Sequence, residues 1–127
     1  MSQTFRRVLM VDDDQSLCRV VARTLSARGI ESRQASTVRE AQAAIAQERP
    51  DLLLLDINLP DRTGWELLRI VGREGIKIPT VVISATRIAP ERLTEFKPTA
   101  YLPKPFPIEA LLRIVMGPEP AEEAANP

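Results

Sequence analysis

Short apolar runs alternate with amphipathic segments along this chain of 127 residues. The most informative run is Leu52–Asp56, in which four consecutive leucines lead directly into an aspartate, with a proline-marked turn following at Pro60. Four apolar residues without polar alternation predict a strand covered on both faces, the usual condition of a central strand in a parallel α/β sheet. Such a strand places Asp56 at its carboxyl end, where open α/β sheets bind their ligands.

Four further segments have the composition of strands, and they are Val8–Val11, Ile30–Ala35, Thr80–Ser84 and Ala100–Leu102. The second is the most polar of them, which is typical of a strand at the edge of a sheet. The third is rich in β-branched residues, which favour strands. Together with the leucine run, these segments predict a sheet of five strands.

Amphipathic segments fill the intervals between the strands and predict helices. The first helix ends at Arg28, because Gly29 supplies a stop signal. The second has a capping-box spacing at Thr37 and Glu40 and is closed by Pro50. The predicted buried face of the first helix consists of Leu17, Val20, Val21, Thr24 and Leu25.

The third predicted helix begins at about Gly64, Pro90 starts a short fourth helix that reaches Phe96, and Pro107 starts the last. The inward-facing residues predicted for the third helix are Trp65, Leu68 and Val71. Strands that alternate with helices in this way predict an α/β fold, doubly wound, with a parallel sheet and helices on both faces. From Gly117 the sequence GPEPAEEAANP holds nothing large and apolar, so we expect residues 1–116 to form one domain and residues 117–127 a Pro/Glu/Ala-rich tail or linker.

Charge and composition exclude several kinds of partner and catalytic site. The chain has 17 basic and 17 acidic residues, a balance that argues against nucleic acid or an anionic membrane as its main partner. The polar start MSQTFRR and the lack of a long apolar run predict a cytoplasmic location. The absence of histidine excludes His-based triads, His-ligated metal sites and an internal phosphohistidine relay. Cys18, the only cysteine, lies in a helical pattern and is interpreted as a core or boundary thiol rather than a nucleophile.

Polar and charged residues follow four of the predicted strands, and they are Asp12, Asp13, Asp56, Ser84 and Lys104. All would meet at one edge of a parallel sheet. Clustered carboxylates repel one another unless a cation lies among them, so the three aspartates predict a hard divalent ion, best matched by Mg²⁺. The lysine and the serine hydroxyl then suit an anion brought to that metal, with phosphate the obvious choice. We therefore expect Asp56 to attack a phosphoryl group as a nucleophile.

Over residues 6–116 the sequence closely resembles the receiver domain of two-component response regulators, the CheY-like family. Four blocks carry the resemblance, and their mutual spacing makes it specific: VLMVDDD, LLLLDINLPDRTGWELL, VVISA and YLPKPF. The resemblance implies a flavodoxin-like fold with strand order 2-1-3-4-5 and a cis Lys104–Pro105 peptide. The segment between Ser84 and Lys104 is a couple of residues shorter than the family pattern, so we expect a fourth helix of barely two turns.

The resemblance also implies a role for each matching residue. Asp56 would be the phosphoacceptor, Asp13 a direct Mg²⁺ ligand, and Asp12 its water-mediated neighbour. Asn58 would offer its backbone carbonyl to the metal. The remaining three matches are the switch serine Ser84, the phosphate-pairing Lys104, and Tyr101, the aromatic residue that changes rotamer on activation.

The implied function is Mg²⁺-dependent phosphoryl acceptance from a sensor histidine kinase or a phosphotransfer protein, which drives a conformational switch in phosphorelay signal transduction. The chain would be no enzyme beyond catalysing its own phosphorylation and dephosphorylation. The resemblance leaves room for a homodimer, and the sequence names neither the kinase nor the downstream protein target.

Other interpretations exist for single residues and for the whole chain. Asp14 is interpreted as a helix cap, and for Tyr101 plain packing competes evenly with the switch role. A haloacid-dehalogenase-type phosphatase is disfavoured, because its second aspartate would stand where Asn58 does and its metal ligands come late in the chain. An EF-hand-like Ca²⁺ loop fails, because Pro60 occupies a ligand position and Asp61 the glycine position. A binding module that is never phosphorylated remains the other alternative.

Overall fold

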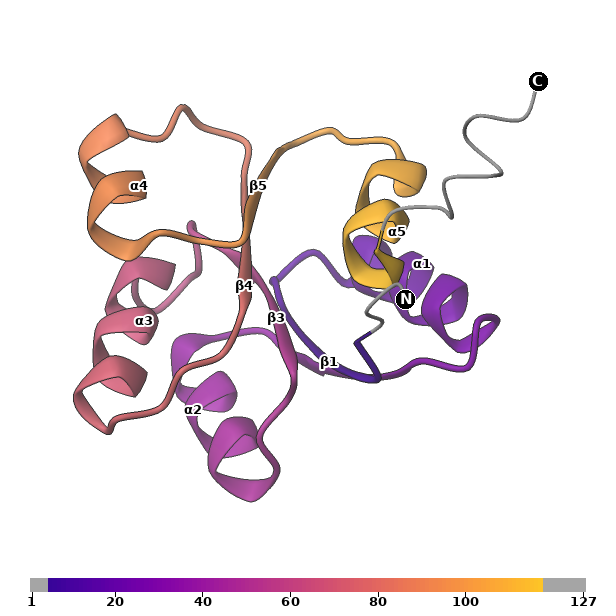
Figure 1. Ribbon diagram of the computed structural model, residues 1–127, viewed down its shortest axis with the longest axis horizontal. Coiled ribbons are helices and arrows are strands. Elements are labelled where there is room, and N and C mark those ends of the chain that lie inside the picture. The colour runs from indigo at the N-terminus through magenta and orange to yellow at the C-terminus, as the bar shows by residue number, and fades with distance from the viewer. Residues whose placement is uncertain (1–4, 118–127) are drawn as a thin grey trace.

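Five strands form one parallel sheet in the computed structural model, which describes residues 5–117 (Figure 1). The strands are β1 Arg7–Val11, β2 Glu31–Ala35, β3 Leu52–Asp56, β4 Thr80–Ser84 and β5 Ala100–Pro103. Their order across the sheet is β2-β1-β3-β4-β5, so the predicted doubly wound α/β fold and strand order are confirmed. The polar strand β2 lies at one edge, as its composition predicted, and β5 lies at the other.

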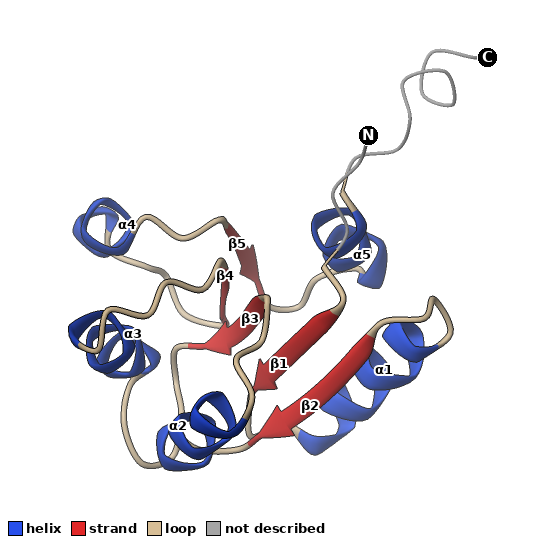
Figure 2. Cartoon of the chain, turned by 60° about the horizontal axis from the view of Figure 1, so that its bottom comes forward, coloured by secondary structure: helices blue, strands red, loops and turns tan. Residues whose placement is uncertain are grey.

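Five helices connect these strands: α1 Gln15–Ser26, α2 Val38–Gln47, α3 Gly64–Arg73, α4 Pro90–Phe96 and α5 Ile108–Met116. Helices α1 and α5 lie on one side of the sheet and α2, α3 and α4 on the other (Figure 2). Helix α4 has only seven residues, which confirms the short fourth helix. No helix in the described part of the chain is long and apolar enough to cross a membrane.

The four leucines of β3 join the two halves of the core. Leu52 and Leu54 pack with side chains of α1 and α5, whereas Leu53 and Leu55 pack with side chains of α2 and α3. All four are fully buried, and burying one leucine side chain contributes about 1.5–3 kcal/mol. The unbroken apolar run is therefore a consequence of helices on both faces of the central strand.

Helix α1 is rotated relative to the prediction. Its buried residues are Cys18, Val21 and Leu25, whereas Val20, which we expected to face the core, is 51% exposed. Successive helical residues are about 100° apart, so a stripe centred on Val21 places Val20 beyond its edge. Cys18 is 1% exposed, which confirms its interpretation as a core residue, and this burial raises the pKa of its thiol to about 11.

The inward face predicted for α3 is confirmed, since Trp65 and Val71 are buried and Leu68 is partly buried against the same part of the core. Leu67, which was not predicted, is fully buried as well. Pro107 is the N-cap of α5 rather than its first residue, so the helix starts at Ile108. Of the predicted tail, Gly117 alone lies within the described residues.

The loop that follows β3 is held by two close approaches. The Gly64 N–H donates a 2.8 Å hydrogen bond to the Ile57 carbonyl, and a methyl group at Gly64 would lie 2.8 Å from the backbone oxygen of Asp56. On the other side, the Asp61 carboxylate accepts hydrogen bonds from the N–H groups of Val38 (3.0 Å) and Arg39 (3.2 Å). The loop beside Asp56 is therefore fastened to α3 and to the start of α2.

We predict that Gly64→Ala destabilises the domain by about 1–3 kcal/mol, because the added methyl group must displace backbone and two core side chains. Gly72→Ala is the matched control, since nothing lies within 4 Å of the added methyl group and alanine favours a helix. Urea denaturation of both variants provides the measurement. Equal stabilities of the two variants would contradict the close approach at Gly64.

The Asp61 contact predicts a pH dependence. Hydrogen bonds from the Val38 and Arg39 N–H groups hold the pKa of Asp61 below its ordinary value of 3.8. Its stabilising effect is therefore fully present above that value and is lost as the pH falls through the lower pKa of the folded state. The gap in melting temperature between wild type and Asp61→Asn should shrink from pH 5 to pH 2.5, and a gap that stays constant would contradict this coupling.

Candidate functional site

Four side chains converge at the carboxyl edge of the sheet from four different strands. Asp12 follows β1, Asp56 and Ser84 are the last residues of β3 and β4, and Lys104 follows β5. The described part of the chain buries four polar or charged residues, and three of them are Asp12, Asp56 and Ser84. Because burying an unpaired polar group is costly, their concentration at one edge indicates a site rather than chance.

Lys104 links the two buried carboxylates. Its Nζ lies 2.8 Å from Asp12 Oδ2 and 3.0 Å from Asp56 Oδ2. The Lys104–Pro105 peptide is cis, as the family resemblance implied, and the Lys104 N–H donates to the Ser84 carbonyl at 2.8 Å. Burial acts to lower the pKa of Lys104, but its pairing with the two negatively charged aspartates outweighs this effect and raises that pKa. The ammonium therefore stays charged within the site.

The three predicted metal ligands lie together. Carboxylate oxygens of Asp12, Asp13 and Asp56 lie within 4.8 Å of one another, with Asp13 exposed and the other two buried. Asp12 Oδ2 is buried and, within residues 5–117, lies near Lys104 without a well-aligned hydrogen bond. Burial raises the pKa of Asp12, and the neighbouring charge of Asp56 adds to this shift. The three carboxylates carry more negative charge than one ammonium can neutralise, and all their ligand atoms are oxygens. They therefore fit a hard divalent cation such as Mg²⁺.

Local backbone contacts orient these aspartates. Asp12 Oδ1 accepts a hydrogen bond from the Asp14 N–H at 2.9 Å, and Asp56 Oδ1 accepts one from the Asn58 N–H at 2.9 Å. Asp14 itself points elsewhere, since its carboxylate accepts from the Leu17 N–H at 3.1 Å and caps α1. The preference for a capping role at Asp14 is thereby confirmed.

The two predicted switch residues lie on neighbouring strands. The Ser84 hydroxyl is engaged by Thr86 rather than by Asp56. Tyr101 on β5 is half-buried and packs against the part of the core formed by α2 and α3. Packing accounts for this position of Tyr101, and its change of rotamer stays a prediction.

Sequence reasoning missed Thr86. Its N–H donates to the Ser84 hydroxyl, and its own hydroxyl contacts both Ser84 Oγ and the Asn58 side chain. A signal for the turn was present, because a serine at a strand end can accept a hydrogen bond from the backbone N–H two residues on, but no pattern singled out the threonine hydroxyl.

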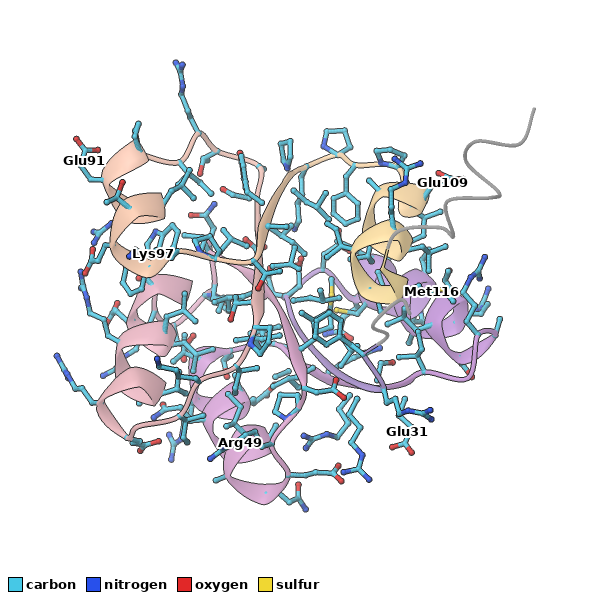
Figure 3. All side chains as sticks on the ribbon, viewed as in Figure 1. Glu31, Arg49, Glu91, Lys97, Glu109 and Met116 are labelled. Atoms are coloured by element: carbon cyan, nitrogen blue, oxygen red, sulfur yellow. The ribbon has the colours of Figure 1, made fainter. Side chains whose placement is uncertain are left out.

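Helix α4 is held to the domain by few contacts. None of its residues is buried, and its aromatic ring, Phe96, stacks on Trp65 of α3 with ring centres 5.0 Å apart. The Arg69 guanidinium lies 5.4 Å from the centre of the Phe96 ring and 3.1 Å from Glu95. Figure 3 shows Glu91 projecting from the outer side of this helix. One aromatic pair and one arginine therefore anchor α4.

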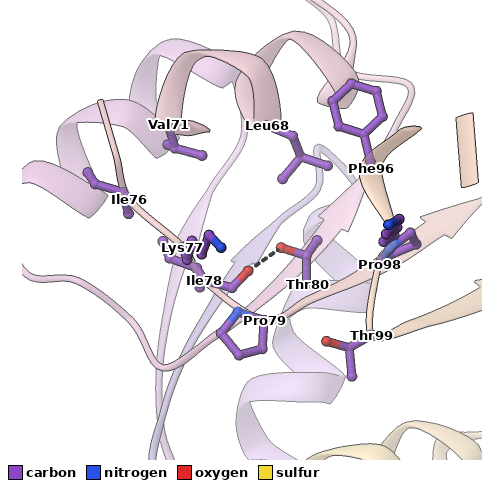
Figure 4. Close-up of a pocket in the computed structure, with 11 residues that line it drawn as sticks. Leu68, Val71, Ile76, Lys77, Ile78, Pro79, Thr80, Phe96, Pro98 and Thr99 are labelled. Carbon is purple, nitrogen blue, oxygen red and sulfur yellow. Dashed lines mark hydrogen bonds between the residues drawn. The ribbon is translucent and has the colours of Figure 1, made fainter. Parts of the chain in front are cut away.

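A groove beside α4 lies away from the carboxylates. It has a volume of about 470 Å³ and is lined by Leu68 of α3, Phe96 of α4 and the residues that lead into β4, among them Ile78 and Pro79 (Figure 4). Thr80, the first residue of β4, closes it and donates to the Ile78 carbonyl at 2.9 Å. The groove thus lies at the amino end of the strand that carries Ser84 at its other end.

Comparisons with known proteins identify the family of this chain. A family model described as the response regulator receiver domain matches residues 8–116. The response regulator MprA of Mycolicibacterium vanbaalenii is 38% identical over 108 residues, which are 84% of this chain and 47% of that protein. Chemotaxis protein CheY4 of Vibrio cholerae superposes with a TM-score of 0.77 and 32% identity, covering 87% of this chain and 95% of that one. For the non-phosphorylated HemR receiver domain of Leptospira biflexa the TM-score is 0.78 with 28% identity, covering 91% and 98%.

A parallel sheet in the order 2-1-3-4-5 with an acidic pocket at its carboxyl edge defines a receiver domain. This chain belongs to the response regulator receiver family. It spans about half the length of the curated relatives that it matches.

The acidic cluster predicts which aspartates bind Mg²⁺. Asp13→Ala should weaken Mg²⁺ binding roughly tenfold or more, because it removes one of three clustered charged oxygen donors. Asp14→Ala is the matched control and should leave the affinity nearly unchanged, since that carboxylate caps α1. Mg²⁺ titration by calorimetry provides the measurement, and equal losses in the two variants would contradict the assignment.

Proposed function

We propose that this receiver domain accepts a phosphoryl group on Asp56 from a phosphohistidine of a sensor histidine kinase or a phosphotransfer protein. The observation that supports this most directly is the placement of Asp56. Its carboxylate is 5% exposed at the end of the central strand, paired with the Lys104 ammonium and anchored by the Asn58 N–H.

In the proposed step, an Asp56 carboxylate oxygen forms a bond to phosphorus while the bond between phosphorus and the partner's histidine nitrogen breaks. The imidazole leaves with its electron pair and is protonated. Lys104 lies beside Asp56 and carries a positive charge that offsets the growing negative charge on the phosphoryl oxygens. The Asn58 N–H holds the Asp56 side chain in a fixed orientation.

The residues present fit Mg²⁺ as the cofactor. Asp12, Asp13 and Asp56 would hold it through carboxylate oxygens, and Asn58 through its backbone carbonyl. When bound, the ion supplies charge neutralisation for the phosphoryl oxygens.

In this proposal the chain catalyses only the phosphorylation and dephosphorylation of its own Asp56. It is otherwise no enzyme. Ser84 and Tyr101 transmit the change to the α4 side of the domain. Residues 1–116 are the functional unit and residues 117–127 a tail or linker. A non-phosphorylated binding module is the competing function, and it requires that Asp56 stays unmodified.

Incubation with Mg²⁺ and acetyl phosphate is predicted to add one phosphoryl group to the wild-type chain and none to Asp56→Asn. The adduct should be labile to hydroxylamine, because an acyl phosphate reacts with that nucleophile. Intact-mass spectrometry measures the addition. A wild-type chain without added mass would favour the binding module, and an adduct that persists in Asp56→Asn would place the acceptor elsewhere.

A further inference from the structure

Thr86, the second residue after β4, joins the two loops that flank the Asp56 carboxylate. Its hydroxyl lies 3.0 Å from Ser84 Oγ and accepts a 3.3 Å hydrogen bond from the Asn58 side-chain amide. Its backbone closes a tight turn with Ser84, since the Thr86 N–H donates to Ser84 Oγ at 3.0 Å and the Thr86 carbonyl accepts from it at 2.9 Å.

The donors and acceptors in this cluster define the resting state. Ser84 has a single hydroxyl proton, which it donates to the Thr86 carbonyl. The Thr86 hydroxyl accepts from Asn58, so its own proton is free to be donated to Ser84 Oγ. Every group is satisfied, and the only proton that Ser84 could offer to a phosphoryl group is already donated to the Thr86 carbonyl.

We propose that Thr86 is a positioning residue that latches the Ser84 hydroxyl in this resting orientation, and that the Thr86 hydroxyl thereby lowers the affinity of the site for a phosphoryl group. This inference rests on the proposed function of Asp56. For Ser84 to donate to a phosphoryl oxygen, its hydroxyl must leave the Thr86 carbonyl, and when Oγ turns toward Asp56 it also loses the hydrogen bond from the Thr86 hydroxyl. The resting state is therefore favoured by the hydrogen bonds that Thr86 makes, and any ligand of the active state must overcome them.

The latch is weak enough to open. Thr86 is exposed, so water can satisfy its carbonyl once Ser84 turns away. The net contribution of one such hydrogen bond changes an equilibrium by roughly two- to tenfold, which biases a switch without locking it. The Asn58 amide contacts the same hydroxyl, so the latch reaches both loops beside Asp56.

The test removes the hydroxyl while keeping the shape of the side chain. Thr86→Val should bind beryllofluoride, a phosphoryl mimic, in the presence of Mg²⁺ roughly two- to tenfold more tightly than wild type, because its resting state has lost a hydrogen bond that the bound state does not use. Thr86→Ser retains a hydroxyl and should restore the wild-type affinity. Thr24→Val is the matched control, since its hydroxyl bonds only the Val20 carbonyl on α1, and it should leave the affinity unchanged.

Affinity and melting temperature together separate the outcomes. An unchanged or weaker affinity in Thr86→Val, with or without a lower melting temperature, overturns the latch and leaves the proposed function intact. A wild-type chain that binds no beryllofluoride and gains no phosphoryl mass overturns the proposed function and the latch with it. If Thr86→Val does not fold, Thr86→Ala removes the same hydroxyl and is subject to the same criterion.

Discussion

The carboxylate of Asp12 is fully buried at the end of β1, and the rest of the site is arranged around that cost. The buried carboxylate needs a positively charged partner. Lys104, which directly follows the edge strand β5, forms ion pairs with both Asp12 and Asp56. These two ion pairs connect the ends of β1, β3 and β5 across the sheet. One lysine cannot neutralise three carboxylates, so the resting domain keeps an excess of negative charge at this edge. This excess of negative charge favours the binding of a divalent cation. While no cation is bound, Lys104 is needed to offset part of that charge.

Two parts of the molecule differ in how firmly they are held, and the difference follows from burial. Strands β3 and β4 are buried along their whole length, so Asp56 and Ser84 project from a rigid base. Helix α4 buries no residue and depends on the Trp65–Phe96 stack and on Arg69. Segments with few buried contacts open at the low end of the free-energy range. A change at Ser84 therefore meets little resistance in the helix that follows it.

The fold could be predicted from the sequence because its strongest signals are local. The leucine run of β3 and the polar edge strand β2 each depend on near neighbours, and the structure confirms them. Gly29 has the positive φ of a stop signal, but α1 already ends at Ser26, two residues before the predicted end at Arg28. The exposure of Val20 could not be predicted, because the sheet beneath α1 sets which side of the helix is buried, whereas Cys18 was expected in the core or at its boundary. The Asp61 contact with α2 joins residues 22 and 23 positions apart, so no local pattern announces it.

In the site, too, some features could be predicted from the sequence and others could not. Clustering of Asp12, Asp13, Asp56 and Lys104 followed from the rule that parallel strands end at one edge, and the structure brings these four residues together. The orientation of the Ser84 hydroxyl did not follow, because it depends on a turn beyond the strand. Asn58 contacts both the acidic cluster and the turn after β4, since its N–H donates to Asp56 and its side-chain amide donates to Thr86. Asn58 therefore links the Asp56 carboxylate to the loop after β4 through two hydrogen bonds of one residue.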